Sequence, residues 1–171
     1  MQTEYDDMVK VAKELKTLTA EYTNTNWQIY VAAFLISAIQ KHSVCIIPPG
    51  GGKSYICLKL ALYYHNQGKK TAIVTSKKYL KTQLMFMMGD LRQMIDVKTM
   101  TEVILCSKDY DQLIIDEADD CILNYGSVFD TERKVLNGFW DVLETPSILI
   151  TATMDRNIED IMHRMFGISS R

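Results

Sequence analysis

Two short segments of the sequence carry residue types that suit chemistry on a phosphorylated ligand. The first reads PPGGGKS at 48–54, directly after the apolar run VCII and directly before the apolar stretch YICLKLALYYH. Glycines let successive backbone N–H groups turn toward one anion without side-chain clashes, and a following helix adds the positive end of its dipole. A strand, a glycine loop and a helix in this order therefore predict a phosphate cradle.

The residue types in this cradle point to a nucleoside triphosphate, ATP, bound with Mg²⁺. Lys53 would reach the β- and γ-phosphates, and the hydroxyl of Ser54 would ligate the metal. The expected cofactor-binding residues of the loop are Pro49, Gly50, Gly51, Gly52, Lys53 and Ser54. The general pattern has a glycine where Ile47 stands, so the match is incomplete, and the alternative is a glycine-rich turn that binds no ligand.

The second segment, LIIDEADD at 113–120, is an apolar strand that ends in carboxylates. Nucleotide-hydrolysing enzymes with such a loop use a strand-terminal aspartate to hold magnesium through water, and we assign that role to Asp116. Glu117 is placed to polarise the attacking water as a general base, so that Lys53, Asp116 and Glu117 form the expected catalytic set. For the two aspartates that end the segment, the alternative is that they lie at the start of a helix, where negative charges interact favourably with the helix dipole.

These two segments resemble motifs I and II of the superfamily 2 helicases, and DEAD at 116–119 is similar to the DEAD-box group. The resemblance implies a RecA-like ATP-binding domain, the first of two motor domains that couple ATP hydrolysis to the binding of RNA or DNA. SILITATM at 147–154 resembles motif III, which in the family lies on a strand between the two ATP-site strands. It implies that Thr151 and Thr153 couple hydrolysis to nucleic-acid binding.

A nucleic-acid track follows from the same resemblance. VTSKKYLKTQL at 74–84 resembles motif Ia, which puts Ser76, Lys77 and Lys78 where contacts to backbone phosphates are made. Thr99 begins the TMTE that stands in place of the family's Thr-Pro-Gly-Arg, and we expect it on the track as well. This segment has an acid where a phosphate-binding arginine is usual, which favours a divergent superfamily 2 member over a strict DEAD-box protein.

Gln28 lies about one helix upstream of the cradle and resembles the adenine-reading glutamine of the Q motif. An amide can pair with both the donor and the acceptor edge of adenine, as glutamine does when it reads a base elsewhere. The alternative is an exposed glutamine at the start of a helix.

Short apolar runs and helical stretches alternate from residue 43 onward and would position these motifs. The runs are VCII (44–47), TAIVT (71–75), IDVKT (95–99), QLIID (112–116) and SILIT (147–151). They lack polar alternation, which predicts strands covered on both faces, as in a parallel sheet. The expected fold is α/β, a three-layer P-loop NTPase (RecA-like) domain whose mainly parallel central sheet is flanked by helices, with ligands at the carboxyl ends of the strands.

We expect residues 1–171 to form a single RecA-like domain with an N-terminal helical extension at 1–26. Helical spacing of apolar residues predicts one helix over 6–22, and the polar string TNTN then caps a second helix. After the motif III segment the chain offers one amphipathic helix, NIEDIMHRMFGI, so we expect the second helicase domain to be absent and supplied in cis or in trans. Arginines from such partners contribute roughly 10³ to 10⁵ in rate, and we therefore expect the isolated chain to hydrolyse ATP very slowly.

Charge is unevenly distributed along the chain. The net charge is -2, yet the stretch between Glu21 and Asp90 carries eight lysines and no acidic residue, so it is +8 while the rest is -10. This split indicates an anionic ligand on the N-terminal half, and a solvated lysine face is the alternative.

Other classes of protein are poorly supported by the composition. The four cysteines form no CxxC pair, which disfavours a zinc site or a disulfide framework. No apolar run approaches the roughly 20 residues that span a bilayer, and the acidic N-terminus is unlike a signal peptide, so we expect a soluble intracellular protein of the cytoplasm or nucleus with no membrane partner. The alternative function is an ATP-gated protein-interaction module that does not move on nucleic acid, favoured by Glu102 and by the acidic second half.

Overall fold

Strands and helices alternate along the part of the chain that the computed structural model describes, which is residues 4–18, 26–37, 41–48, 52–121, 142, 144–153, 156, 159–160 and 163. The helices are α1 (Glu4–Leu18), α2 (Asn26–Ser37), α3 (Lys53–Asn66), α4 (Lys78–Met88) and α5 (Met100–Cys106), with short 3₁₀ turns η1 (Gly89–Gln93) and η2 (Ser107–Asp109). The strands are β1 (His42–Ile46), β2 (Thr71–Thr75), β3 (Asp96–Thr99), β4 (Gln112–Ile115) and β5 (Ser147–Thr151).

All five strands form one parallel sheet in the order β1-β5-β4-β2-β3. Each apolar run in the sequence becomes one of these strands, including the weak run at 95–99. The chain leaves β1, passes through α3 and returns as β2, three positions away in the sheet. Strands β4 and β5 later fill the gap between β2 and β1. The predicted α/β class with a parallel central sheet is confirmed.

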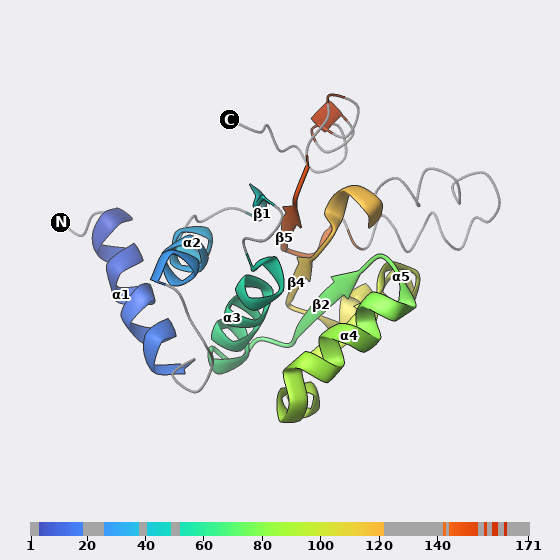
Figure 1. Cartoon of the computed structure of the whole chain (residues 1–171), viewed down its shortest axis with the longest axis horizontal. Helices are drawn as coiled ribbons and strands as arrows, with labels where there is room; N and C mark the ends of the chain where they lie inside the picture. The colour runs from blue at the N-terminus through green and yellow to red at the C-terminus, as the bar shows by residue number, and fades with distance from the viewer. Residues whose placement is uncertain are drawn as a thin grey trace.

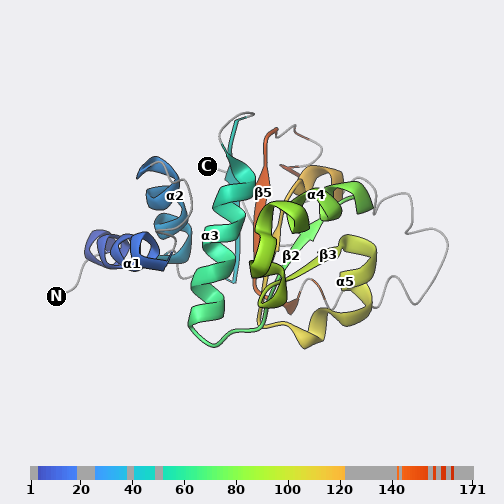
Figure 2. The same ribbon diagram turned by 60° about the horizontal axis from the view of Figure 1, so that its bottom comes forward.

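The three central strands β2, β4 and β5 are buried on both faces because their alternate side chains enter two different cores, whereas the edge strands β1 and β3 are partly exposed. Ile73, Ile114 and Ile148 pack with α3, α4 and the N-terminal helices. Their neighbours on the same strands, such as Val74 and Ile115, pack with α5 and with the helical segment that starts at residue 118. Figure 2 shows α3 and α4 together on one side of the sheet. Burial on both faces explains why the strand sequences lack polar alternation.

The two N-terminal helices lie side by side next to α3 (Figure 1). Val11 and Leu15 of α1 belong to the same buried cluster as Ala32 of α2 and Leu60 of α3. The helix expected over 6–22 runs from Glu4 to Leu18, and the string TNTN lies mostly outside the described residues. Among the described residues, no helix is both long and apolar enough to cross a membrane.

Candidate functional site

The carboxyl edge of the sheet collects the segments that the sequence marks for chemistry. Helix α3 starts at Lys53 shortly after β1 ends, and the acidic turn at 116–117 directly follows β4. Parallel pairing aligns Ile46 of β1 with Thr151 of β5, and Ile115 of β4 with Leu149 of β5. The β1 and β4 ends therefore flank the β5 end, which is the switch point where open α/β sheets bind ligands.

Lys53 and Glu117 meet at this edge although 64 positions separate them in the sequence. The Nζ atom of Lys53 donates a hydrogen bond to Oε1 of Glu117 at 2.5 Å, and the two side chains are 15% and 31% exposed. Burial by itself lowers the pKa of Lys53, but the hydrogen bond to Glu117 and the charges of Asp116 and Glu117 more than offset this and raise it. The three residues expected to be catalytic thus form one electrostatic cluster.

Asp116 is buried at the end of β4, with 8% of its surface exposed. Burial raises the pKa of its carboxyl above the ordinary value, although the charge of Lys53 opposes the shift. Its Oδ1 accepts a hydrogen bond from the backbone N–H of Glu117 at 2.9 Å. Glu117 has a left-handed backbone with φ of 51°, an unusual conformation for a side-chain-bearing residue that is concentrated at functional turns.

Gln28 contacts the end of the glycine loop. Gly52 has φ of 75°, and a Cβ atom added to it would lie 2.1 Å from Nε2 of Gln28, so a larger residue would strain the backbone and displace the Gln28 side chain. Gln28 is buried, with 7% exposure, in contrast to the exposed glutamine that the alternative interpretation expects. Ser54 lies half-buried in the first turn of α3, while Pro49, Gly50 and Gly51 lie outside the described residues.

The two threonines of the SILITATM segment connect β5 to the helical segment that follows the acidic turn. The Thr151 hydroxyl donates to the backbone oxygen of Thr153 at 2.8 Å, and the Thr153 hydroxyl donates to Oδ2 of Asp119 at 3.2 Å. The other oxygen of Asp119, Oδ1, is buried and has no hydrogen-bond partner among the described residues. The link between Thr153 and Asp119 is a site contact that sequence reasoning did not specify.

The expected nucleic-acid residues lie at the same edge, on the neighbouring strands. Ser76, Lys77 and Lys78 follow β2, and Thr99 ends β3, where it pairs in register with Thr75. Lys77 and Lys78 are exposed, whereas Ser76 is half-buried, and its hydroxyl has no hydrogen-bond partner in the described part of the chain.

Thr99 is buried and caps helix α5. Its hydroxyl accepts a hydrogen bond from the backbone N–H of Glu102 at 3.2 Å and donates one to Oε1 of Glu102, and the Glu102 side chain also accepts from the Thr99 backbone N–H. Glu102 in turn accepts two hydrogen bonds from Nζ of Lys81, each of 2.9 Å. The pattern Thr-x-x-Glu is a capping-box signature, so sequence alone could have identified the cap but not Lys81 as its partner.

The lysine-rich stretch does not form one basic surface. Lys69 and Lys70 precede β2 at the amino edge, Lys59 is buried in α3 and Lys81 is paired. Lys41 precedes β1, also at the amino edge, and pairs with Glu144 at 3.1 Å. Among the described lysines, the exposed ones at the carboxyl edge are Lys77 and Lys78.

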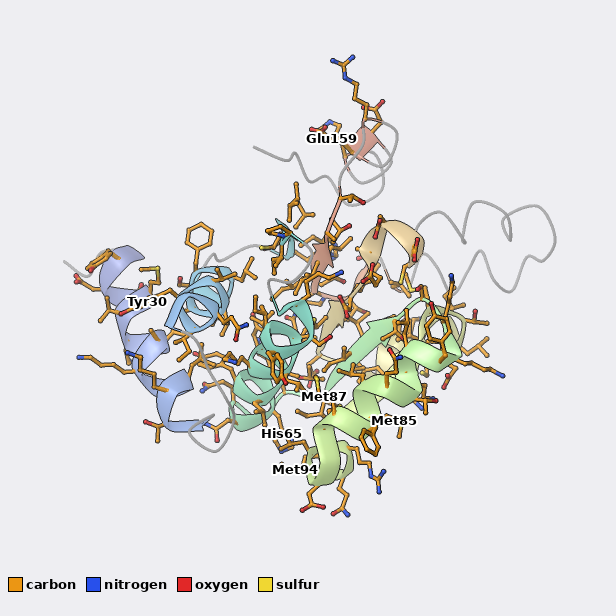
Figure 3. The ribbon with its side chains drawn as sticks, viewed as in Figure 1. Tyr30, His65, Met85, Met87, Met94 and Glu159 are labelled. Atoms are coloured by element: carbon orange, nitrogen blue, oxygen red, sulfur yellow. The ribbon has the colours of Figure 1, made fainter. Side chains whose placement is uncertain are left out.

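A pocket of about 290 Å³ lies at the opposite, amino edge of the sheet. Its lining includes His65 and Met94, which Figure 3 shows near one another, together with Thr71 and Asp96 from the starts of β2 and β3. It is therefore remote from Lys53 and Asp116, and we assign no chemistry to it.

Comparison with known proteins defines the fold. The sequence matches no protein-family model and no curated protein. Among solved structures, it is similar to a hypothetical ATP-dependent RNA helicase from Sulfolobus tokodaii, with a TM-score of 0.61, 16% identity and coverage of 92% of this chain and 56% of that one. A fragment described as an HsdR subunit of a type I restriction enzyme from Vibrio vulnificus YJ016 gives a TM-score of 0.56, 16% identity and coverage of 92% and 32%.

The domain is therefore an α/β domain of the RecA-like class found in a helicase. The chain spans 56% and 32% of the lengths of the two structures. Any activity of those longer proteins is therefore only a proposal for this chain.

Proposed function

We propose that this chain is the ATP-binding motor domain 1 of a superfamily 2, DEAD-box-like helicase or translocase, and that it couples ATP binding and hydrolysis to the binding of RNA or DNA. The observation that carries the proposal is the contact between Lys53 and Glu117, with Asp116 beside them. Two motifs that are distant in sequence meet at the switch point of a RecA-like sheet, with the charges that a triphosphate, a metal ion and an attacking water require.

The described residues fit ATP and Mg²⁺. Gly52 packs against the end of the Gln28 side chain and has the left-handed backbone that a phosphate-binding turn needs, and helix α3 starts at the next residue. Ser54 and Asp116 supply the hard oxygen donors that Mg²⁺ prefers. Bound Mg²⁺ would neutralise charge that develops on the phosphates. Lys53 would hold the terminal phosphates, Glu117 would accept a proton from water, and Gln28 would contact the adenine side.

The nucleic-acid part of the proposal is supported by Lys77 and Lys78. They are exposed on the first turn of α4 and just before it, at the carboxyl edge next to the nucleotide residues. Lysines that contact backbone phosphates contribute affinity without reading sequence, which suits a motor that moves along a strand. Thr151 and Thr153 would transmit the nucleotide state, because Thr153 already contacts Asp119 in the helical segment just after the acidic turn.

A second RecA-like domain, in cis or in trans, completes the proposal. The chain spans 56% of the length of the helicase to which it is similar. We therefore expect the isolated chain to bind ATP and to hydrolyse it very slowly, since a partner's arginine contributes roughly 10³ to 10⁵ in rate.

One observation favours the alternative, an ATP-gated protein-interaction module. The Lys81–Glu102 pair lies beside Thr99, where the nucleic-acid track would pass, and puts a carboxylate there. A module that binds protein has no need of a continuous basic track, so this acid would be harmless to it.

The test is binding of a labelled single-stranded oligonucleotide, RNA or DNA, with and without a non-hydrolysable ATP analogue at low and moderate salt. A motor domain should bind more tightly at low salt, with a slope set by its phosphate contacts. The analogue should change the affinity. No binding at low salt, even with a second RecA-like domain supplied, would exclude the motor and leave the module.

A further inference from the structure

The ion pair between Lys81 and Glu102 connects two helices that both start at the carboxyl edge of the sheet. Lys81 lies in the first turn of α4, and its backbone N–H donates to the carbonyl oxygen of Lys77. Glu102 lies in the first turn of α5. The two side chains are 24% and 34% exposed, so the pair is reachable from solvent but partly shielded from it.

Glu102 is held in place by more contacts than an ordinary surface acid. Both of its oxygens accept hydrogen bonds from Nζ of Lys81, and its side chain and backbone also close the capping box with Thr99. Burial would raise the pKa of Glu102, but the hydrogen bond and charge of Lys81 and the contacts to Thr99 lower it below its ordinary value. The carboxylate is therefore a fixed negative charge at neutral pH.

This charge lies on the path that the proposed nucleic-acid residues define. Thr75 and Thr99 are register partners, so the segment 76–78 and the cap of α5 start side by side. A strand that leaves Lys77 and Lys78 toward Thr99 meets the Lys81–Glu102 pair next. Lys81 cannot donate fully to a phosphate while both oxygens of Glu102 accept its protons, and Glu102 itself repels a phosphate.

We propose that Glu102 limits the nucleic-acid affinity of this domain by holding Lys81 in an ion pair, so that Glu102 is an affinity-determining residue and Lys81 is a masked phosphate contact. This rests on the proposed function, because it assumes that a polyanion crosses this edge. Glu102 acts in two ways, by pairing with Lys81 and by repelling phosphate with its own charge. Its contacts in the cap of α5 hold the carboxylate in the position that both effects need.

The substitution Glu102→Gln separates charge from structure. Glutamine at this position also closes a capping box, so α5 keeps its cap while Lys81 loses its ionic partner. Glu144→Gln is the matched control, because it makes the same change of charge in the exposed pair with Lys41 at the opposite edge of the sheet. Lys81→Gln and the double variant complete a cycle.

Binding of a fluorescein-labelled single-stranded oligouridylate to the full chain, titrated by anisotropy over a range of salt concentrations, is the measurement. We expect Glu102→Gln to tighten binding about fivefold at low salt and to steepen the log–log salt slope by about 0.7, the value for one added phosphate contact on a single strand. Lys81→Gln alone should change affinity less than about twofold, and it should cancel the gain in the double variant.

The outcomes separate this inference from the proposed function. If the wild type binds and Glu102→Gln binds with the same affinity, the proposed role of Glu102 is wrong and the motor proposal stands. The ion pair then serves only to hold α4 and α5 together. An equal gain from Glu144→Gln also overturns it, because net charge alone then explains the effect. Absence of binding in every variant at low salt, even with a second RecA-like domain supplied, overturns both.

Discussion

The Nζ atom of Lys53 donates a hydrogen bond to Oε1 of Glu117, so the lysine at the start of α3 and the acid after β4 neutralise each other. In the proposed reaction both groups have other tasks, since Lys53 holds phosphate and Glu117 accepts a proton. A triphosphate that binds Lys53 must compete with Glu117, and by competing it frees the carboxylate for water. In the proposed reaction the contact would therefore join nucleotide binding to exposure of the general base.

Lys53→Ala should abolish nucleotide binding. The variant loses the charge-assisted hydrogen bonds to the phosphates and leaves the charges of Asp116 and Glu117 uncompensated, and we expect affinity for ATP to fall by about 100-fold or more. Titration with a fluorescent ATP analogue measures this. Lys69→Ala, at the exposed amino edge, is the control and should bind as the wild type does. Comparable affinity in both variants would remove Lys53 from the site.

Glu117→Gln should retain nucleotide binding and lose turnover. Glutamine cannot accept a proton at neutral pH, so single-turnover phosphate release should fall by about 10² to 10⁴, while ATP binds at least as tightly because Lys53 no longer has an ionic partner. The assay needs the second RecA-like domain, with Glu14→Gln on α1 as the control. Full turnover by Glu117→Gln would show that another group is the base.

Asp116→Asn should stabilise the free chain near neutral pH. Burial raises the pKa of its carboxyl above the ordinary value. At a pH between the ordinary and the raised pKa, the folded state binds more protons than the unfolded state. The free energy of unfolding therefore falls as the pH rises through this window. Asparagine carries no charge and keeps the acceptor for the backbone of Glu117. We expect the free energy of unfolding in urea to increase by about 1 kcal/mol at pH about 7, and the gain to shrink toward pH about 4.

The exposed Asp90 offers the control for that measurement, since Asp90→Asn removes a carboxylate from the surface turn η1. A stability gain for Asp116→Asn that does not depend on pH would contradict the desolvation argument. A loss of stability would indicate that the charge of Asp116 is needed to balance Lys53.

Thr153→Ala should uncouple the nucleotide site from nucleic-acid binding. The hydroxyl that donates to Asp119 is lost, so the effect of an ATP analogue on oligonucleotide affinity should weaken by about tenfold, with little change in affinity for the analogue itself. Thr153→Ser keeps the hydroxyl and should keep the coupling. Equal coupling in both variants would assign the transmission to other contacts.

The strands and the chemistry-bearing segments could be predicted from the sequence because they depend on local pattern. Apolar runs without alternation predicted five strands covered on both faces, which holds for β2, β4 and β5, while the edge strands β1 and β3 are partly exposed. The glycine loop before a helix and the carboxylates after a strand predicted where ligands would bind. The place of β5 between β1 and β4 was expected from the resemblance of the SILIT run to motif III, whereas the places of β2 and β3 were not.

The placement of charge could not be predicted in this way. The eight lysines from Lys41 to Lys81 form one block in the sequence. In the fold, some of them lie at the amino edge of the sheet, Lys59 is buried and Lys81 pairs with Glu102. Each strand and helix runs about 10 to 20 Å across the domain, so residues close together in the chain lie at opposite edges of the sheet.

The sequence by itself determined which residues we expect to bind phosphate, hold a metal ion and accept a proton. Each of these roles is indicated by the residue types at a few neighbouring positions. Tertiary structure alone decided that Lys53 touches Glu117, that Thr153 touches Asp119 and that Glu102 holds Lys81. Each of these contacts joins segments that belong to different strands or helices. The order of strands in the sheet sets how far apart two such segments lie, and no local sequence pattern encodes that order.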